Sequence, residues 1–172
     1  AALEALYDSA ESFPQPKCHP ETRTRILDDL YTWAIGTGSS HAIFWLYGPA
    51  QAGAGKSAIM QSLCQRLQDG HHLGGSFFFK RGDTIRASAK VLFATLACQL
   101  TLGSSALRGL ISKRAKHDPS VVRRSLSVQL RELIIQPCKS LKNPTISLLL
   151  IDGLDECESQ ELQQEVLRLL SD

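Results

Sequence analysis

The stretch GPAQAGAGKS (residues 48–57) decides the fold of this chain. It stands between an apolar run, AIFWLY (42–47), and a segment whose apolar residues recur at helical spacing. Glycines let successive backbone N–H groups turn toward one anion, and the following helix adds its positive N-terminal end. In such a loop Lys56 reaches the β- and γ-phosphates and the Ser57 hydroxyl binds Mg²⁺. The stretch therefore predicts a P-loop for ATP or GTP. Its candidate phosphate-binding residues are Gly53, Ala54, Gly55, Lys56, Ser57 and Ala58.

The spacing of this loop departs from the usual G-x-x-x-x-G-K-[ST]. That pattern requires glycine at position 50, where the chain has Ala50, and six residues separate Gly48 from Gly55. Either Ala50 replaces the first glycine, which is tolerable if its φ is not positive, or Gln51-Ala52 is an insertion. An insertion would bulge outward and leave GAGKS intact.

A second motif, LLLIDGLDEC (148–157), ends an apolar strand with acidic residues. Ligands of open α/β sheets bind at the carboxyl ends of strands, so Asp152 is a candidate ligand of the same Mg²⁺. Asp155 and Glu156 are candidate catalytic residues that orient or deprotonate the attacking water. The alternative for these two acids is that they cap a helix N-terminus, where acidic residues are favoured anyway.

Strands alternate with helical segments along the chain, which predicts an α/β fold. The apolar run 42–47 lacks polar alternation, as expected for a strand that is buried on both faces. Together these features predict a P-loop NTPase three-layer sandwich, with helices on both faces of a parallel sheet. Further strands are expected at 75–79 and 145–151, and helices around 3–10, 20–35, 57–67, 88–102, 105–116, 125–136 and 162–170.

Composition excludes several classes of protein. A formal charge of +2 on 172 residues is close to balanced and gives no indication of a nucleic-acid partner. No stretch approaches the roughly 20 apolar residues of a membrane span. The odd number of cysteines, five, without metal-ligand spacing, argues against a disulfide framework and a zinc site. A reducing, cytoplasmic location is therefore expected.

The sequence stretches around the two motifs resemble those of fungal NACHT domains, which are STAND-class NTPases. They also resemble those of the nephrocystin-like N-terminal domain described for the same chains. The resemblance runs from about Phe13 to the end. In these proteins the acids are displaced from the first Asp, as they are here by Gly153. The stretches that carry the resemblance are PKCHPETR, WLYGPA, GAGKSAI, SFFFKRGD, LFATLACQL and IDGLDE.

The resemblance implies a signalling switch, part of a longer chain, that binds ATP or GTP, hydrolyses it slowly and possesses further domains. In fungi, relatives take part in non-self recognition and regulated cell death, and activation can involve homo-oligomers. It places Arg23 near the base and ribose and Arg81 near the site. It also implies a five-stranded sheet in which a later strand separates 42–47 from 145–151. On this basis residues 1–19 form an N-terminal helix and connector, and 20–172 a core that is incomplete at its C-terminus.

Two other functions stay open on the sequence. A P-loop kinase would need an arginine-rich lid, for which RAKHDPSVVRR (114–124) is the candidate. The second is a degenerate domain that acts as a scaffold without hydrolysis.

Overall fold

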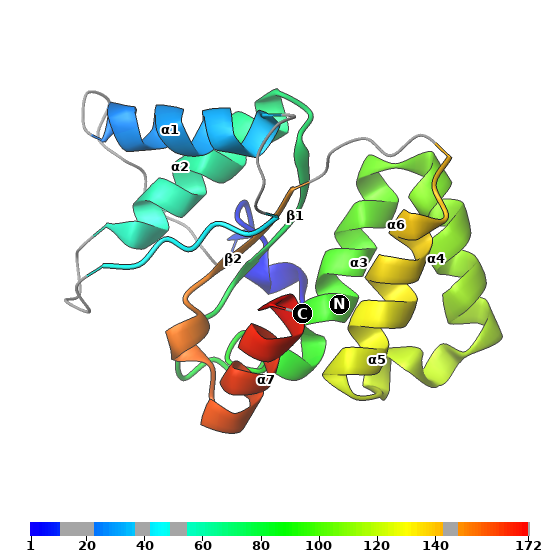
Figure 1. Cartoon of the computed structure of the whole chain (residues 1–172). Helices are drawn as coiled ribbons and strands as arrows, with labels where there is room; N and C mark the ends of the chain where they lie inside the picture. Colours follow the sequence, from blue (N-terminus) through cyan, green and yellow to red (C-terminus); the bar gives the residue numbers. More distant parts are fainter. Residues whose placement is uncertain (11–22, 37–41, 49–54, 143–147, 172) are drawn as a thin grey trace.

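The computed structural model describes residues 1–10, 23–36, 42–48, 55–142 and 148–171. Within them, a two-stranded parallel sheet lies between two layers of helices (Figure 1). Its strands are β1 (Leu73–Phe78) and β2 (Leu148–Asp152). The register pairs Leu73 with Leu148 and Phe78 with Asp152, with an irregularity after Leu73. Parallel pairing was predicted, because the strands are joined through helices rather than a hairpin.

Both faces of the sheet are covered, so side chains along each strand alternate between two cores. On one face, Phe78 and Leu150 pack with α1 (Thr24–Ile35) and α2 (Lys56–Asp69). On the other face, Phe77 belongs to a larger core. That core is built with η3 (Ala89–Val91), α3 (Leu92–Gly103), α4 (Ser105–His117), η4 (Pro119–Arg123), α5 (Leu126–Leu130), η5 (Arg131–Ile135), α6 (Gln136–Lys139) and α7 (Gln160–Ser171).

The helices predicted at 88–102 and 105–116 are confirmed as η3 with α3 and as α4. Ser104 caps α4, because its side chain accepts a hydrogen bond from the Leu107 N–H at 3.3 Å. The helix predicted at 125–136 is longer and composite, since α5, a π-helical turn η5 and α6 follow one another. Pro137 explains the wide turn, because a proline inside a regular helix lacks an N–H and clashes with the preceding turn.

The predicted strand 42–47 is wrong for this structure. The segment is extended but lies outside the sheet, and no backbone hydrogen bond joins it to β2 within the described residues. It is also exposed rather than buried, with Trp45 at 49% and Tyr47 at 91%. Figure 1 shows the segment, in cyan, as a coil. Only Leu46 packs against the α1–α2 core, while Phe44 contacts Trp33 at 5.3 Å between ring centroids. Apolar residues alone did not make a strand because an isolated strand lacks a hydrogen-bonded neighbour.

The N-terminal helix expected around 3–10 is reduced to one short 3₁₀ turn, η1 (Leu3–Ala5). The rest of residues 1–10 is instead held to the core by long-range bonds. The Ala2 N–H donates to Thr95 Oγ1 at 2.8 Å, and the Tyr7 N–H donates to Ser76 Oγ at 3.1 Å. Tertiary partners thus replace the helical hydrogen bonds that seven or eight residues cannot sustain alone.

Candidate functional site

The chain turns sharply at a glycine where α2 begins. Gly55 is its N-cap with φ 71 and ψ 21, and the Ile59 N–H donates to the Gly55 carbonyl at 3.0 Å. This left-handed conformation favours glycine. Lys56, Ser57 and Ala58 then form the first helical turn, where backbone N–H groups that point along the axis and the helix dipole favour an anion. The predicted Gly53 and Ala54, and the question of Ala50 against a Gln51-Ala52 insertion, lie outside the described residues.

Arg23 lies against this helix start. Its own φ is 60, also left-handed, and it precedes α1 directly. A Cβ added at Gly55 would come within 2.6 Å of the Arg23 Cζ atom, so the guanidinium sits over the glycine. The φ of Gly55 therefore favours glycine at this position, and the Arg23 guanidinium occupies the space that its missing side chain leaves. The arrangement brings the charge of Arg23 next to the Lys56 turn and the positive end of α2.

Ser57 and Asp152 meet across the gap between the helix and the sheet. Asp152 is the last residue of β2, and the Ser57 hydroxyl donates a hydrogen bond to its carboxylate. Burial raises the pKa of Asp152, and the charges of Glu156 and Asp155 act in the same direction. The bonds from Ser57 and from the Gly153 N–H oppose that rise. A desolvated carboxylate beside a hydroxyl is an oxygen-donor pair that suits a hard cation such as Mg²⁺.

A tight turn, η6 (Leu154–Glu156), follows Asp152 and brings the two other acids back toward it. Gly153 has φ 68, and the Glu156 N–H donates to the Gly153 carbonyl at 2.7 Å. A Cβ at Gly153 would lie 3.2 Å from the Phe79 carbonyl oxygen. An acid directly after Asp152 would thus be strained, which gives a physical reason for the displaced acids at 155 and 156.

Arg81 braces this acidic turn from the loop that follows β1. Its backbone N–H donates to Glu156 Oε2 at 2.9 Å, and its Nη2 donates to the Asp155 carbonyl at 3.2 Å. Arg81, which the resemblance placed near the site, thus lies beside Glu156 and Asp155. The Glu156 carboxylate is therefore oriented by main chain as well as by its own turn.

The Arg81 loop is itself fixed by an ion pair that the sequence reasoning missed. Asp83 Oδ2 accepts from Arg86 Nε and Nη2, both at 2.9 Å, and the Arg86 side chain is only 6% exposed. Backbone N–H groups of Arg86 and Ile85 also donate to the Asp83 carboxylate. These backbone bonds, then the Arg86 side chain, hold the pKa of Asp83 at about 2. A signal was present in the sequence, since Asp followed three residues later by Arg suits a capped turn.

The structure thus brings together Ser57, Asp152 and the acidic turn, and separately sets Arg23 beside Gly55. No group of three His, Cys, Asp or Glu side chains able to hold a metal occurs among the described residues. A cation at Asp152 would therefore depend on Ser57, on water and on the ligand's own oxygens.

The segment considered as a kinase lid is largely helical in this structure. Residues 114–117 end α4, and Pro119–Arg123 forms η4. Arg114 pairs with Glu132 at 2.7 Å and Arg124 with Asp118 at 3.4 Å, on the helical side of the molecule.

The comparisons with known proteins identify a family for this chain and nothing more specific. A family model described as nephrocystin 3, N-terminal, matches residues 21–172. The chain belongs to this family. Searches of curated proteins and of solved structures found no match. Of the residues described, no helix has both the length and the apolar character to cross a membrane.

Proposed function

We propose that this member of the nephrocystin 3 N-terminal family binds ATP or GTP with Mg²⁺, hydrolyses it slowly and acts as a conformational switch in signalling. The observation that carries the proposal is the hydrogen bond between Ser57, at the start of α2, and Asp152, at the end of β2. This pair joins the two motifs that a P-loop NTPase needs, on elements far apart in sequence.

The positive groups favour the phosphates. The α2 N-terminus offers backbone N–H groups, and Lys56 and Arg23 add two positive charges next to Gly55. Ser57 and Asp152 would hold Mg²⁺, which supplies neutralisation of the phosphate oxygens. Both are oxygen donors, and the burial that raises the Asp152 pKa would be compensated by a cation.

Glu156 is the better candidate for the base. Its carboxylate is held by the Arg81 N–H at 2.9 Å, whereas Asp155 contributes a backbone carbonyl to the Arg81 guanidinium. A fixed carboxylate can orient a water and accept its proton as the water oxygen bonds to the γ-phosphorus. The bond from that phosphorus to the bridging oxygen breaks, and the nucleoside diphosphate leaves. Asp155 is exposed and stays a secondary candidate.

The switch role rests on the resemblance to NACHT domains, and the unpaired segment 42–48 supports it. This segment leads into the phosphate loop, is extended, and exposes Phe44, Trp45 and Tyr47. Exposed apolar side chains in that position can become buried when a ligand binds beside them. Further domains of a longer chain and assembly with other copies belong to the same proposal.

Calorimetry with Mg-ATP and Mg-GTP tests the proposal directly. We expect saturable binding to the wild-type chain, and about tenfold to hundredfold weaker binding for Lys56→Ala, since a charge-assisted hydrogen bond contributes about 1.5–3 kcal/mol. Lys113→Ala on α4 makes the same chemical change away from the site and should bind like wild type. Equal heats for the wild type and Lys56→Ala would contradict nucleotide binding at this site. The alternative of a degenerate scaffold domain without hydrolysis would then remain.

A further inference from the structure

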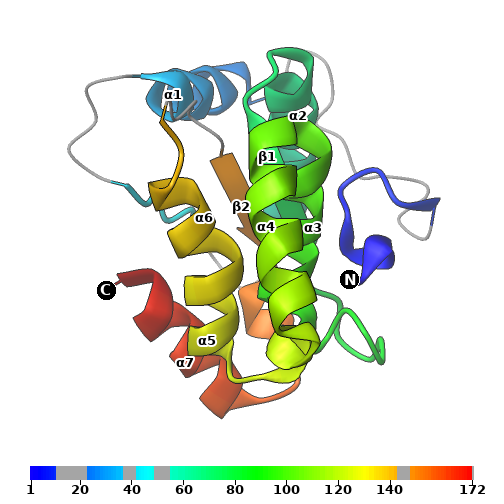
Figure 2. The ribbon, with the colours of Figure 1, turned by 90° about the vertical axis from the view of Figure 1, so that its right-hand side faces the viewer.

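The near balance of charge conceals an uneven distribution along the chain. Residues 105–142 contain nine Lys or Arg and two acidic residues, while the remainder contains ten and fifteen. This basic segment forms α4, η4 and the composite helix α5–α6. Figure 2 shows α4 at the front, on the outer side of this helical layer, with α3 behind it. The excess positive charge is thus concentrated on the side of the molecule away from α1 and α2 (Figure 1).

Neither acidic residue of the segment neutralises the outer face of α4. Glu132 accepts from Arg114 at 2.7 Å and from Arg131 at 3.0 Å. Asp118 pairs with Arg124 at 3.4 Å, and its carboxylate also accepts from Ser120 at 3.1 Å and 2.6 Å. Both carboxylates therefore pair with side chains that do not belong to the outer face of α4.

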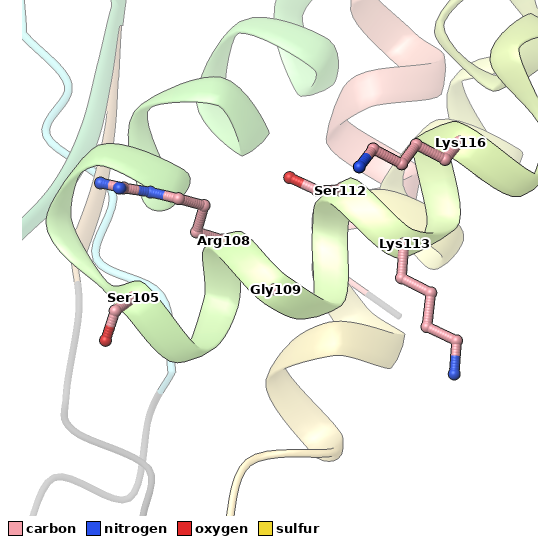
Figure 3. Close-up of a pocket in the computed structure, with 6 residues that line it drawn as sticks. All are labelled: Ser105, Arg108, Gly109, Ser112, Lys113 and Lys116. Atoms are coloured by element: carbon pink, nitrogen blue, oxygen red, sulfur yellow. The ribbon is translucent and has the colours of Figure 1, made fainter.

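The outer face of α4 forms an open trough of about 550 Å³ (Figure 3). Small residues, Ser105, Gly109 and Ser112, alternate along it with longer cationic side chains. In Figure 3 the side chain of Lys116 extends back toward Ser112, whereas that of Lys113 extends away from the helix in another direction. No carboxylate lines it. The lining residues are Ser105, Arg108, Gly109, Ser112, Lys113 and Lys116.

Arg108 is held in position at one end of this trough. Its Nε donates to the Thr101 carbonyl at 2.9 Å. A guanidinium has five N–H donors, so one bond to a carbonyl leaves most of them for a carboxylate. Arg108 and Lys116 are eight residues apart, which is about 12 Å along a helix axis or slightly over two turns.

We propose that this trough is a docking surface for an acidic α-helix of another protein. Small residues at positions i, i+4 and i+7 let a second helix approach closely, because the distance between helix axes depends on the side chains at the contact. Glutamates spaced one to two turns apart on that helix would reach Arg108, Lys113 and Lys116. Complementary charge then sets the orientation and speeds association.

Two observations favour a protein partner over a nucleic acid. Exposed apolar residues stand near the two ends of α4, Leu102 at 68% and Val122 at 44%, and apolar contacts anchor protein interfaces. Residues 105–142 contain no Phe, Tyr or Trp, so the basic surface has no aromatic platform for stacking bases.

Fluorescence anisotropy of a labelled helical peptide tests this surface. The probe carries Glu at every fourth position on one face with Leu and Ala elsewhere, and the matched probe has Gln in place of each Glu. We expect the Glu peptide to bind the 172-residue chain about tenfold tighter than the Gln peptide. The double variant Arg108→Glu/Lys116→Glu should lose about tenfold or more of that affinity.

Gly109→Leu separates docking of a helix from general attraction between charges. A Cβ at Gly109 meets no atom within 4 Å, so the variant keeps the fold, which circular dichroism checks, while the leucine fills the trough. We expect Gly109→Leu to lower the affinity for the Glu peptide about tenfold. The control Arg25→Glu, on α1, should change that affinity less than about twofold. The proposal is overturned if Gly109→Leu binds like wild type, if the Glu peptide does not bind, or if oligo(U) RNA or anionic phospholipid vesicles compete more strongly for the same cations.

Discussion

The two faces of the sheet are covered by layers whose cores differ in size. Among the described residues, eighteen buried residues form the core toward α3–α7, and seven form the core on the α1–α2 side. The exposed aromatics of segment 42–48 lie on the α1–α2 side, which we call the thin layer, just before the predicted phosphate loop. The candidate site lies between the α1–α2 layer and the sheet, because α2 supplies Ser57 and β2 supplies Asp152. A firm layer can hold the acids in place while the thin layer rearranges around a ligand.

The largest effect should come from matched leucine truncations in the two layers. Leu96→Ala in α3 removes a side chain that is 1% exposed, and Leu30→Ala in α1 removes one that is 4% exposed. We expect the free energy of unfolding to fall by about 3–4 kcal/mol for Leu96→Ala and about 2 kcal/mol for Leu30→Ala, since the thin layer relaxes into the cavity more easily. Urea denaturation measures both. Equal losses would remove the distinction between the layers.

Next in size is the ion pair that braces the loop between β1 and α3. Asp83→Asn leaves the buried Arg86 charge without its carboxylate and should lower the free energy of unfolding by about 2 kcal/mol at pH 7. The folded pKa of Asp83, about 2, is below its ordinary 3.8. Its stabilisation is therefore present above the ordinary pKa and is lost as the pH falls through about 2.

Urea unfolding at pH 7 and at pH 3 checks this dependence. The difference between wild type and Asp83→Asn should shrink at the lower pH. Ser105→Ala, at the exposed start of α4, serves as the control for a small surface change. A difference that stays constant between the two pH values would show that Asp83 acts through shape rather than charge.

A smaller effect on folding, but a larger one on binding, is expected for Asp152→Asn. Burial raises the pKa of this carboxyl, so its charge opposes folding above the ordinary pKa and this cost disappears as the pH falls. The variant should thus be as stable as wild type or more stable at pH 7, yet bind Mg-ATP at least about tenfold more weakly. Thermal unfolding and calorimetry measure the two quantities. Unchanged Mg-dependent affinity would remove Asp152 from the proposed cation site.

The smallest signal concerns the movement of the thin layer. In Trp33→Phe the remaining tryptophan is Trp45, which is 49% exposed. If nucleotide orders the segment that leads into the phosphate loop, Trp45 emission should move to shorter wavelength and acrylamide quenching should decrease. Identical spectra with and without saturating Mg-ATP, for a variant shown to bind it, would mean that segment 42–48 does not respond.

Much of the fold could be predicted because the patterns concerned are local. The predicted helix at 105–116 is α4, and the apolar run before Asp152 indicates a buried strand. Glycine at 55 before Lys56 likewise indicated a sharp turn into a helix, and its φ of 71 agrees. These features depend on interactions among residues close in sequence, so composition and spacing carry them.

The tertiary structure alone decided which residues far apart in the sequence contact one another. The sequence AIFWLY predicted a strand, yet strand formation needs a neighbour, and these residues have none in the described sheet. The Arg81 bond to Glu156 and the Arg23 position over Gly55 join loops and helix ends.

The chain by itself determined two motifs, their order and the parallel sheet, since these follow from residue type and period. The three-dimensional arrangement decided that Ser57 touches Asp152, that the turn at Gly153 brings Asp155 and Glu156 close enough to act on Asp152, and that positive charge gathers on α4. The physical reason is the same in each case. Burial and charge depend on which surfaces meet, and that information is spread over the whole chain rather than over any one stretch of it.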